Sequence, residues 1–265
     1  MVRFSFIISV VCASIILCLS SCVTEIEGCT DTSALNFNIE ATQNCCCEYA
    51  SDSLAEWTIQ FKHSIQGDSA ERNVWFSGDS AEYSISLWRY YLSNFYYVNT
   101  KGLEIPFSDT IVFIDGFQAA AVLLQSAPDS IMGFGFHWGI DSLRNNTSQP
   151  NMFPASHPLG AKSPSMYWSW ATDYLFCKVE GKYRKNGEEG PITWHIGRDA
   201  AYGKAFIPVN QALSAESANV FVLEADLNTF ANVLELPEEA QTHTSVTDAT
   251  TKKFKTYFPS MFRLK

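Results

Sequence analysis

After its first 22 residues, the sequence has no apolar run long enough to span a bilayer. It also lacks a nucleophile elbow, a phosphate-binding loop, an HExxH helix and a dinucleotide fingerprint, so we expect a non-enzymatic protein. Basic residues are scarce: 18 Lys and Arg stand against 28 Asp and Glu, a formal net charge of -10. Because phosphate repels an acidic surface, this charge argues against nucleic acid as a partner.

The N-terminal segment predicts export from the cytoplasm. Arg3 precedes an apolar run that ends in Leu19-Ser20-Ser21-Cys22. Small residues before a Cys resemble a bacterial lipoprotein signal, in which residues 1–21 are removed and Cys22 carries the lipid that binds the membrane. A plain secretory signal cut nearby is the alternative. The first interpretation predicts an outer-membrane lipoprotein of the cell envelope, facing the periplasm or the cell surface.

Residues 22–55 are expected to form a cysteine-rich tether. The stretch "GCTDTSALNFNIEATQNCCCEY" resembles a short Cys-bounded motif of exported proteins of the Bacteroidota. In an oxidising compartment its cysteines should form disulfides, with a metal–thiolate cluster as the alternative. Two of the three pairings join sequence neighbours and the third is Cys29–Cys46 with Cys45–Cys47, so the pairing stays open. The disulfide candidates are Cys29, Cys45, Cys46 and Cys47.

Residues 56–265 have the pattern of an all-β domain. Trp57, Ile59, Phe61 and His63 alternate with polar residues, which is typical of a half-buried strand. Many short strands with turn signals between them predict an antiparallel β-sandwich. Further strands are expected at 84–99, 109–115, 119–125, 130–140, 175–179, 192–197, 204–209 and 219–226. The remaining expectations are a long loop at 141–165, a short helix at 226–234, and a solvated tail or edge strand at 252–265.

The histidines are the candidate ligands. His63 continues an apolar face, where a buried ring needs hydrogen-bond partners or a metal. His195 lies at a strand end in the phase opposite to Trp194. The ordinary interpretation of each is a core or surface histidine. His137 and His157 carry no clear signal, and His243 lies in a polar segment where we expect it to be exposed and without function.

An ordered series of motifs resembles the MbnP-like family, copper-binding proteins associated with methanobactin operons. The stretch "MYWSWATDYLFCKVEGKY" (166–183) is followed by "TWHIG" (193–197), and "FKH" (61–63) and "YYLSNFYYVN" (90–99) precede it. Two residues depart from the family pattern: Asp173 replaces the usual Gly, and Trp194 the usual Phe. The matching positions in the main motif are Met166, Trp168, Trp170, Tyr174, Phe176, Glu180, Gly181, His195, Ile196 and Gly197.

The resemblance implies an extracytoplasmic β-sandwich that binds copper, or another transition metal, through histidines. Carried over residue by residue, His63 and His195 become the metal ligands, brought to one ion by the fold. A partner di-haem peroxidase would oxidise Trp168 or Trp170 to kynurenine near the site. The alternative is a surface recognition module that binds glycan or protein through exposed Trp side chains and the 141–165 loop.

Overall fold

A computed structural model describes residues 25–30, 36–47, 54–107, 109–126, 130–160, 166–168, 173–243 and 248–265. The chain divides into two compact units, residues 1–52 and 53–265. Cys22 and Trp170 lie outside the described residues, so their predicted roles stay predictions. Among the described helices, none is both long enough and apolar enough to cross a membrane.

The described chain is mostly β-strand, as the sequence predicts. The strands are β1 (Glu27–Gly28), β2 (Gln43–Asn44), β3 (Ala55–Ile65), β4 (Asp68–Ser69), β5 (Trp75–Ser77), β6 (Glu82–Asn99), β7 (Glu104–Pro106), β8 (Ile111–Asp115), β9 (Ala120–Ser126), β10 (Ser130–Trp138), β11 (Tyr167–Trp168), β12 (Asp173–Lys185), β13 (Glu188–Gly197), β14 (Gly203–Ala212), β15 (Asn219–Asp226), β16 (Gln241–His243) and β17 (Phe262–Leu264). The helices are α1 (Ser142–Thr147), η1 (Pro150–Met152), η3 (Asp199–Ala201), α2 (Asn228–Ala231), α3 (Ala249–Tyr257) and η4 (Phe258–Met261).

The small N-terminal unit is held by its cysteines. Its two-residue strands β1 and β2 pair in parallel. Disulfides join Cys29 to Cys47 and Cys45 to Cys46. The disulfide prediction is therefore confirmed, and the pairing is one of those that join sequence neighbours rather than Cys29–Cys46 with Cys45–Cys47.

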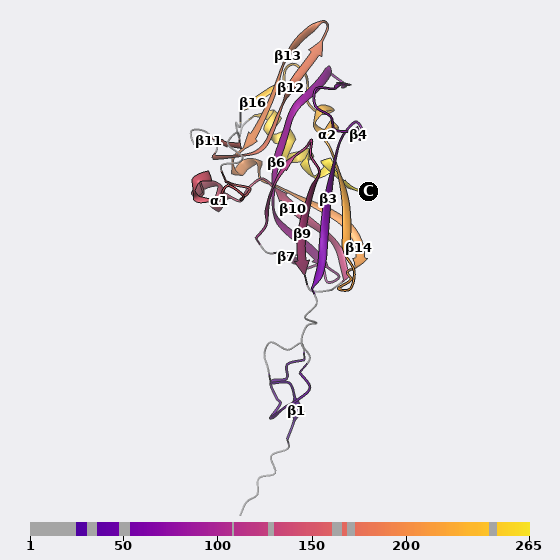
Figure 1. The fold of residues 1–265 in the computed structure, drawn as a ribbon, viewed down its shortest axis with the longest axis vertical. Helices are drawn as coiled ribbons and strands as arrows, with labels where there is room; N and C mark the ends of the chain where they lie inside the picture. The colour runs from indigo at the N-terminus through magenta and orange to yellow at the C-terminus, as the bar shows by residue number, and fades with distance from the viewer. Residues whose placement is uncertain are drawn as a thin grey trace, which may run out of the picture. The chain divides into compact units, whose positions relative to one another are not determined.

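Residues 53–265 form a β-sandwich. The larger sheet has the strand order β14-β10-β6-β12-β13-β16, with β5, β7 and β8 also paired to β6 and β11 paired to β12. The smaller sheet has the order β17-β15-β3-β4, with β9 paired to β3. In Figure 1 the β12–β13 hairpin projects at the top of the domain, with β11 and β16 beside it. Asn186 and Gly187 both have positive φ at the hairpin's turn, which matches the predicted turn at 186–191.

Aromatic side chains fill the space between the sheets. Trp57 of β3 is fully buried, and its ring centroid lies 5.0 Å from that of Phe107 and 5.3 Å from that of Phe221. Phe61, four positions along the same strand, packs against Phe136 of the larger sheet. The alternation predicted from the sequence thus points into the core. Cys177, the single cysteine after residue 47, is also buried there.

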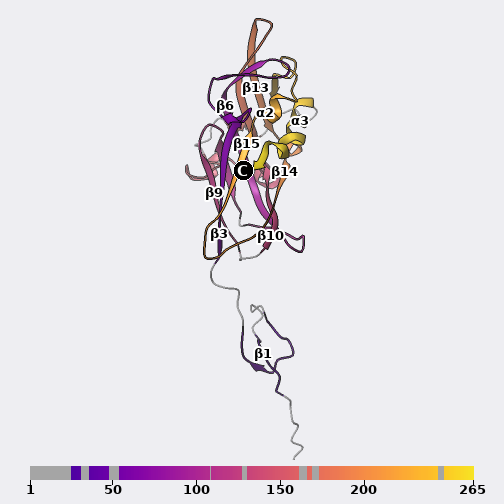
Figure 2. The same ribbon diagram turned by 90° about the vertical axis from the view of Figure 1, so that its right-hand side faces the viewer.

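The C-terminal segment differs from the prediction. Residues 262–264 do form an edge strand, β17, but the preceding residues form helix α3 instead of a solvated tail. Phe254 of α3 is fully buried against Phe230 of the predicted short helix, now α2, and against Trp194. Figure 2 shows α2 and α3 together at the upper end of the domain, near β13. Helix α3 has one buried aromatic residue, Phe254, among lysines, and this was too weak a signal to predict the helix from the sequence.

Candidate metal site

The two faces of the larger sheet carry different side chains. Val179 pairs with Trp88 across β12 and β6, and residues directly opposite each other share a face. Both side chains are fully buried in the sandwich core, which defines the inner face. Side chains alternate along a strand, so Lys178 and Glu180 belong to the opposite, outer face. His195 of β13 pairs with Lys178, which places its ring on the outer face too.

His195 is held by a carboxylate on the neighbouring strand. Its Nε2 lies 3.0 Å from Oε1 of Glu180, and Nζ of Lys178 lies 3.0 Å from the same oxygen. Burial alone would raise the pKa of Glu180, but the hydrogen bonds from Lys178 and His195 outweigh it and lower that pKa. The result is a row of three side chains that fixes the imidazole in place.

One ring nitrogen of His195 stands out. The residue is only 5% exposed, and its Nδ1 has no hydrogen-bond partner in the part of the chain that the structure describes. Burial lowers the pKa of His195 despite the hydrogen bond to Glu180, so the ring is neutral at pH 7. A neutral ring that donates from Nε2 keeps a lone pair on Nδ1, which is the form that binds a metal.

His243 supplies a second imidazole beside the first. Strand β16 pairs in parallel with β13, and His243 lies directly opposite His195. The two ring centroids are 5.2 Å apart. Because metal–nitrogen bonds to imidazole are about 2 Å long, rings that share one ion have centroids roughly 5–6 Å apart. His243 is exposed, as predicted, and its ring lies beside that of His195, so we no longer treat it as a residue without function.

Trp168 lies against the histidine pair. It belongs to β11, which pairs with the start of β12 through Trp168 and Asp173. Its ring meets that of His195 edge-on, with centroids 4.9 Å apart and planes at 88°, and lies 6.4 Å from His243. The structure therefore brings together two of the predicted site residues, His195 and Trp168. We call Trp168, Lys178, Glu180, His195 and His243 the outer-face cluster.

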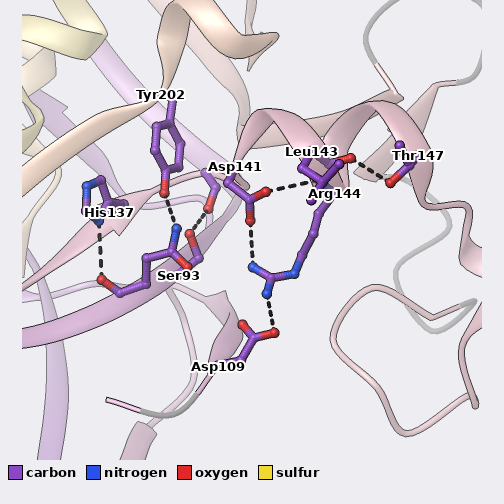
Figure 3. A network of polar contacts seen from close by, with 10 residues as sticks. Ser93, Asp109, His137, Asp141, Leu143, Arg144, Thr147 and Tyr202 are labelled. Atoms are coloured by element: carbon purple, nitrogen blue, oxygen red, sulfur yellow. Dashed lines mark hydrogen bonds and ion pairs between the residues drawn. The ribbon is translucent and has the colours of Figure 1, made fainter. Parts of the chain in front are cut away.

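The long loop before β11 is fastened to the sandwich by polar contacts. Asp141 caps α1, accepting a hydrogen bond from the backbone N–H of Arg144, whose guanidinium also pairs with Asp141 and Asp109 (Figure 3). Asn145 of α1 accepts a hydrogen bond from the backbone of Tyr174 in β12. Asp199, just after β13, accepts one from Ser142 at 2.7 Å. The start of the predicted loop is thus a short helix, tied by Asn145 to β12 and by Ser142 to the segment that follows β13.

His63 lies elsewhere. Its Nε2 and the Tyr90 hydroxyl share a hydrogen bond of 2.8 Å, and its ring meets Trp88 edge-on at 5.1 Å. Tyr90 pairs with Cys177 and Trp88 with Val179, so both rings are on the inner face. His63 is therefore separated from His195 by the thickness of the larger sheet. The expectation that these two imidazoles meet at one ion is wrong for this arrangement.

The remaining histidines have structural partners. His137 donates from Nδ1 to the backbone oxygen of Asn94 and stacks on Tyr202, with ring planes at 9° (Figure 3). His157 accepts a hydrogen bond from the backbone N–H of Leu159 and stacks on Phe153. In the part of the chain that the structure describes, neither ring contacts a second imidazole, whereas the outer-face cluster contains two imidazoles.

The chemistry open to the cluster follows from its donors. Among the described residues, no three His, Cys, Asp or Glu side chains are arranged to hold an ion. Two imidazoles suit a cation that accepts few nitrogen ligands, such as copper, better than Mg²⁺ or Ca²⁺, which require many oxygens. The buried, unpartnered Nδ1 of His195 fits such an ion.

Three members of the cluster, Lys178, Glu180 and His243, were missed as site residues. Glu180 was visible as part of the polar side of its strand and of the family motif, yet only the β12–β13 pairing shows that it reaches His195. His243 belongs to a three-residue strand, which is too short to predict from alternation. Its parallel pairing with a distant strand leaves no local signal in the sequence.

Comparison with known protein families identifies the family of this chain. The model of the MbnP family matches residues 55–248. A solved structure, MbnP from Methylosinus trichosporium, is similar with 14% identity and a TM-score of 0.47, covering 67% of this chain and 77% of that chain. No curated protein sequence matches. Because the family model spans well over half of the sequence, this chain belongs to the MbnP family, which is linked to methanobactin and copper.

Proposed function

We propose that this chain is a non-enzymatic copper-binding lipoprotein of the cell envelope, with His195 and His243 as its copper ligands. The observation that carries the proposal is the buried lone pair on Nδ1 of His195, next to a second imidazole. Family membership favours copper over other transition metals. His63, a ligand candidate from the sequence, is assigned no metal role.

An unsatisfied buried nitrogen needs a physical reason. Leaving such an atom without a partner costs about 1–3 kcal/mol, and folded proteins rarely retain this cost. A bound cation at Nδ1 would remove it. Imidazole nitrogen is a good ligand for copper, which stands at the top of the divalent affinity order. The Trp168 ring packs edge-on against His195 at the same place.

Three further parts of the proposal come from the sequence. Cys22 would carry the lipid that ties the protein to the outer membrane. A di-haem peroxidase would act as partner and oxidise a Trp of the 166–183 motif to kynurenine. Of the two candidates, Trp168 is the one whose ring we place beside the histidines.

A copper titration tests the ligand assignment. We expect the purified mature protein to bind one equivalent of copper in competition with a chromophoric chelator. His243→Ala should weaken binding by more than the roughly 10–100-fold that loss of an outer-shell partner causes, since it removes a ligand itself. Because His243 is exposed, this change should leave the unfolding midpoint nearly unchanged.

The matched controls are His63→Ala and His157→Ala. Each removes an imidazole away from the outer-face cluster, so copper affinity should match that of the unaltered protein. If His63→Ala abolishes binding while His243→Ala does not, the site lies on the inner face and the assignment fails.

Oxidation of Trp168 is a separate prediction. Peptide mass spectrometry of protein isolated from its own host should find the Trp-to-kynurenine mass change on the peptide that holds residues 166–173. Fragment ions should place it on Trp168, and a Trp168→Phe variant should lack it. An unmodified Trp168 in native material would rule out the peroxidase partner but not copper binding.

A further inference from the structure

The contact between Glu180 and His195 determines which nitrogen of the ring is available. A carboxylate only accepts hydrogen bonds, so the ring nitrogen 3.0 Å from Oε1 of Glu180 must carry the hydrogen. That nitrogen is Nε2. The lone pair of the neutral ring is then confined to Nδ1, the atom that is buried without a described partner.

Lys178 and the strand pairing hold Glu180 in this role. Nζ of Lys178 binds the same carboxylate oxygen at 3.0 Å, and only 12% of the Lys178 side chain is exposed. Lys178 lies directly opposite His195, while Glu180 lies opposite Thr193, so the carboxylate reaches diagonally along the outer face to the ring. The direction of the Glu180 side chain is therefore set by an ion pair as well as by its own strand.

We propose that Glu180 is a positioning residue that fixes His195 in the Nε2–H tautomer and so presents Nδ1 as the metal-binding atom, with Lys178 anchoring its carboxylate. The inference rests on the proposed copper site. A hydrogen bond from the far nitrogen of a metal-binding imidazole to a carboxylate orients the ring and makes the bound nitrogen a better donor. Glu180 touches no metal in this arrangement and acts through His195.

The tautomer can be measured without copper. Two-bond ¹H–¹⁵N correlation spectra of the metal-free protein should show a protonated Nε2 and an unprotonated Nδ1 for His195. Glu180→Ala should mix or reverse this pattern and weaken copper binding roughly 10–100-fold, the usual effect of losing an outer-shell partner. Glu180→Gln, whose amide oxygen can accept the same hydrogen bond, should restore the tautomer and part of the affinity.

The matched control is Glu189→Ala, on the partner strand of the same hairpin, where the carboxylate pairs with Arg184 instead. It should change neither the tautomer nor the affinity. A protonated Nδ1 in the unaltered protein, or full affinity and an unchanged tautomer in Glu180→Ala, overturns the role of Glu180 alone. If the unaltered protein has the expected tautomer but binds no copper, the proposed function fails and the metal role of Glu180 fails with it.

Discussion

Trp57→Ala should lower the free energy of unfolding by about 3–5 kcal/mol, the range for removing a large aromatic side chain from a packed core. Trp57 is fully buried and touches rings from both sheets, including Phe221 of the smaller sheet and Phe134 of the larger one. Its Nε1 also donates a 2.9 Å hydrogen bond to Ser126. The change therefore leaves a cavity at the sheet–sheet contact and a buried hydroxyl without its donor.

Urea unfolding followed by circular dichroism measures this difference. Trp75→Ala is the matched control, because Trp75 is half-buried and its ring lies under the guanidinium of the half-buried Arg184. That change should lower stability by about 1 kcal/mol or less, as expected for a site outside the core. Equal losses in the two variants would contradict the placement of Trp57 at the centre of the sandwich.

Acidification from pH 6.5 to pH 4 should destabilise the protein through His63. Burial lowers the pKa of His63 to about 4, with a smaller opposing effect from Asp115. In the unfolded chain its pKa is about 6.5, so between these values the unfolded state binds the proton and the folded state does not. The neutral ring therefore makes its full contribution to the free energy of unfolding above pH 6.5. That free energy falls by about 2–3 kcal/mol as the pH approaches 4.

The His63→Gln variant isolates this contribution. It has no group that titrates at the position, so its stability should fall less steeply than that of the unaltered protein over the same pH interval. Tyr90→Phe keeps the buried ring and should retain the full slope, with a constant loss of about 1 kcal/mol for the missing hydrogen bond. If unaltered protein and His63→Gln lose stability in parallel, His63 is not the titrating group.

These two predictions concern side chains that point into the core, and the sequence correctly predicted which side chains these are. Alternation from Trp57 to His63 correctly indicated one buried side, because a strand in a sandwich must place every second residue in the core. The β-sandwich itself was predictable for the same reason. Family motifs reinforced it, since they follow the strands in order along the chain.

The main failure of the prediction from sequence was to bring His63 and His195 together at one metal ion. His63 shares the phase of Phe61, a core residue, whereas His195 alternates with Trp194, also a core residue. These phases place the two imidazoles on different faces, a signal that was present in the sequence. What no local pattern could supply was the neighbour of His195, because the pairing of β13 with β16 joins segments that are separated in the chain by strands β14 and β15 and helix α2.

The position of the cysteines has a practical consequence. Both disulfides lie in the N-terminal unit, and the sandwich has only Cys177, whose thiol pKa is raised by burial. Reductants strong enough to keep copper monovalent should therefore leave the sandwich folded. The buried thiol of Cys177 will not bind the ion in place of the histidines. Cuprous and cupric affinities can then be compared on one and the same folded domain.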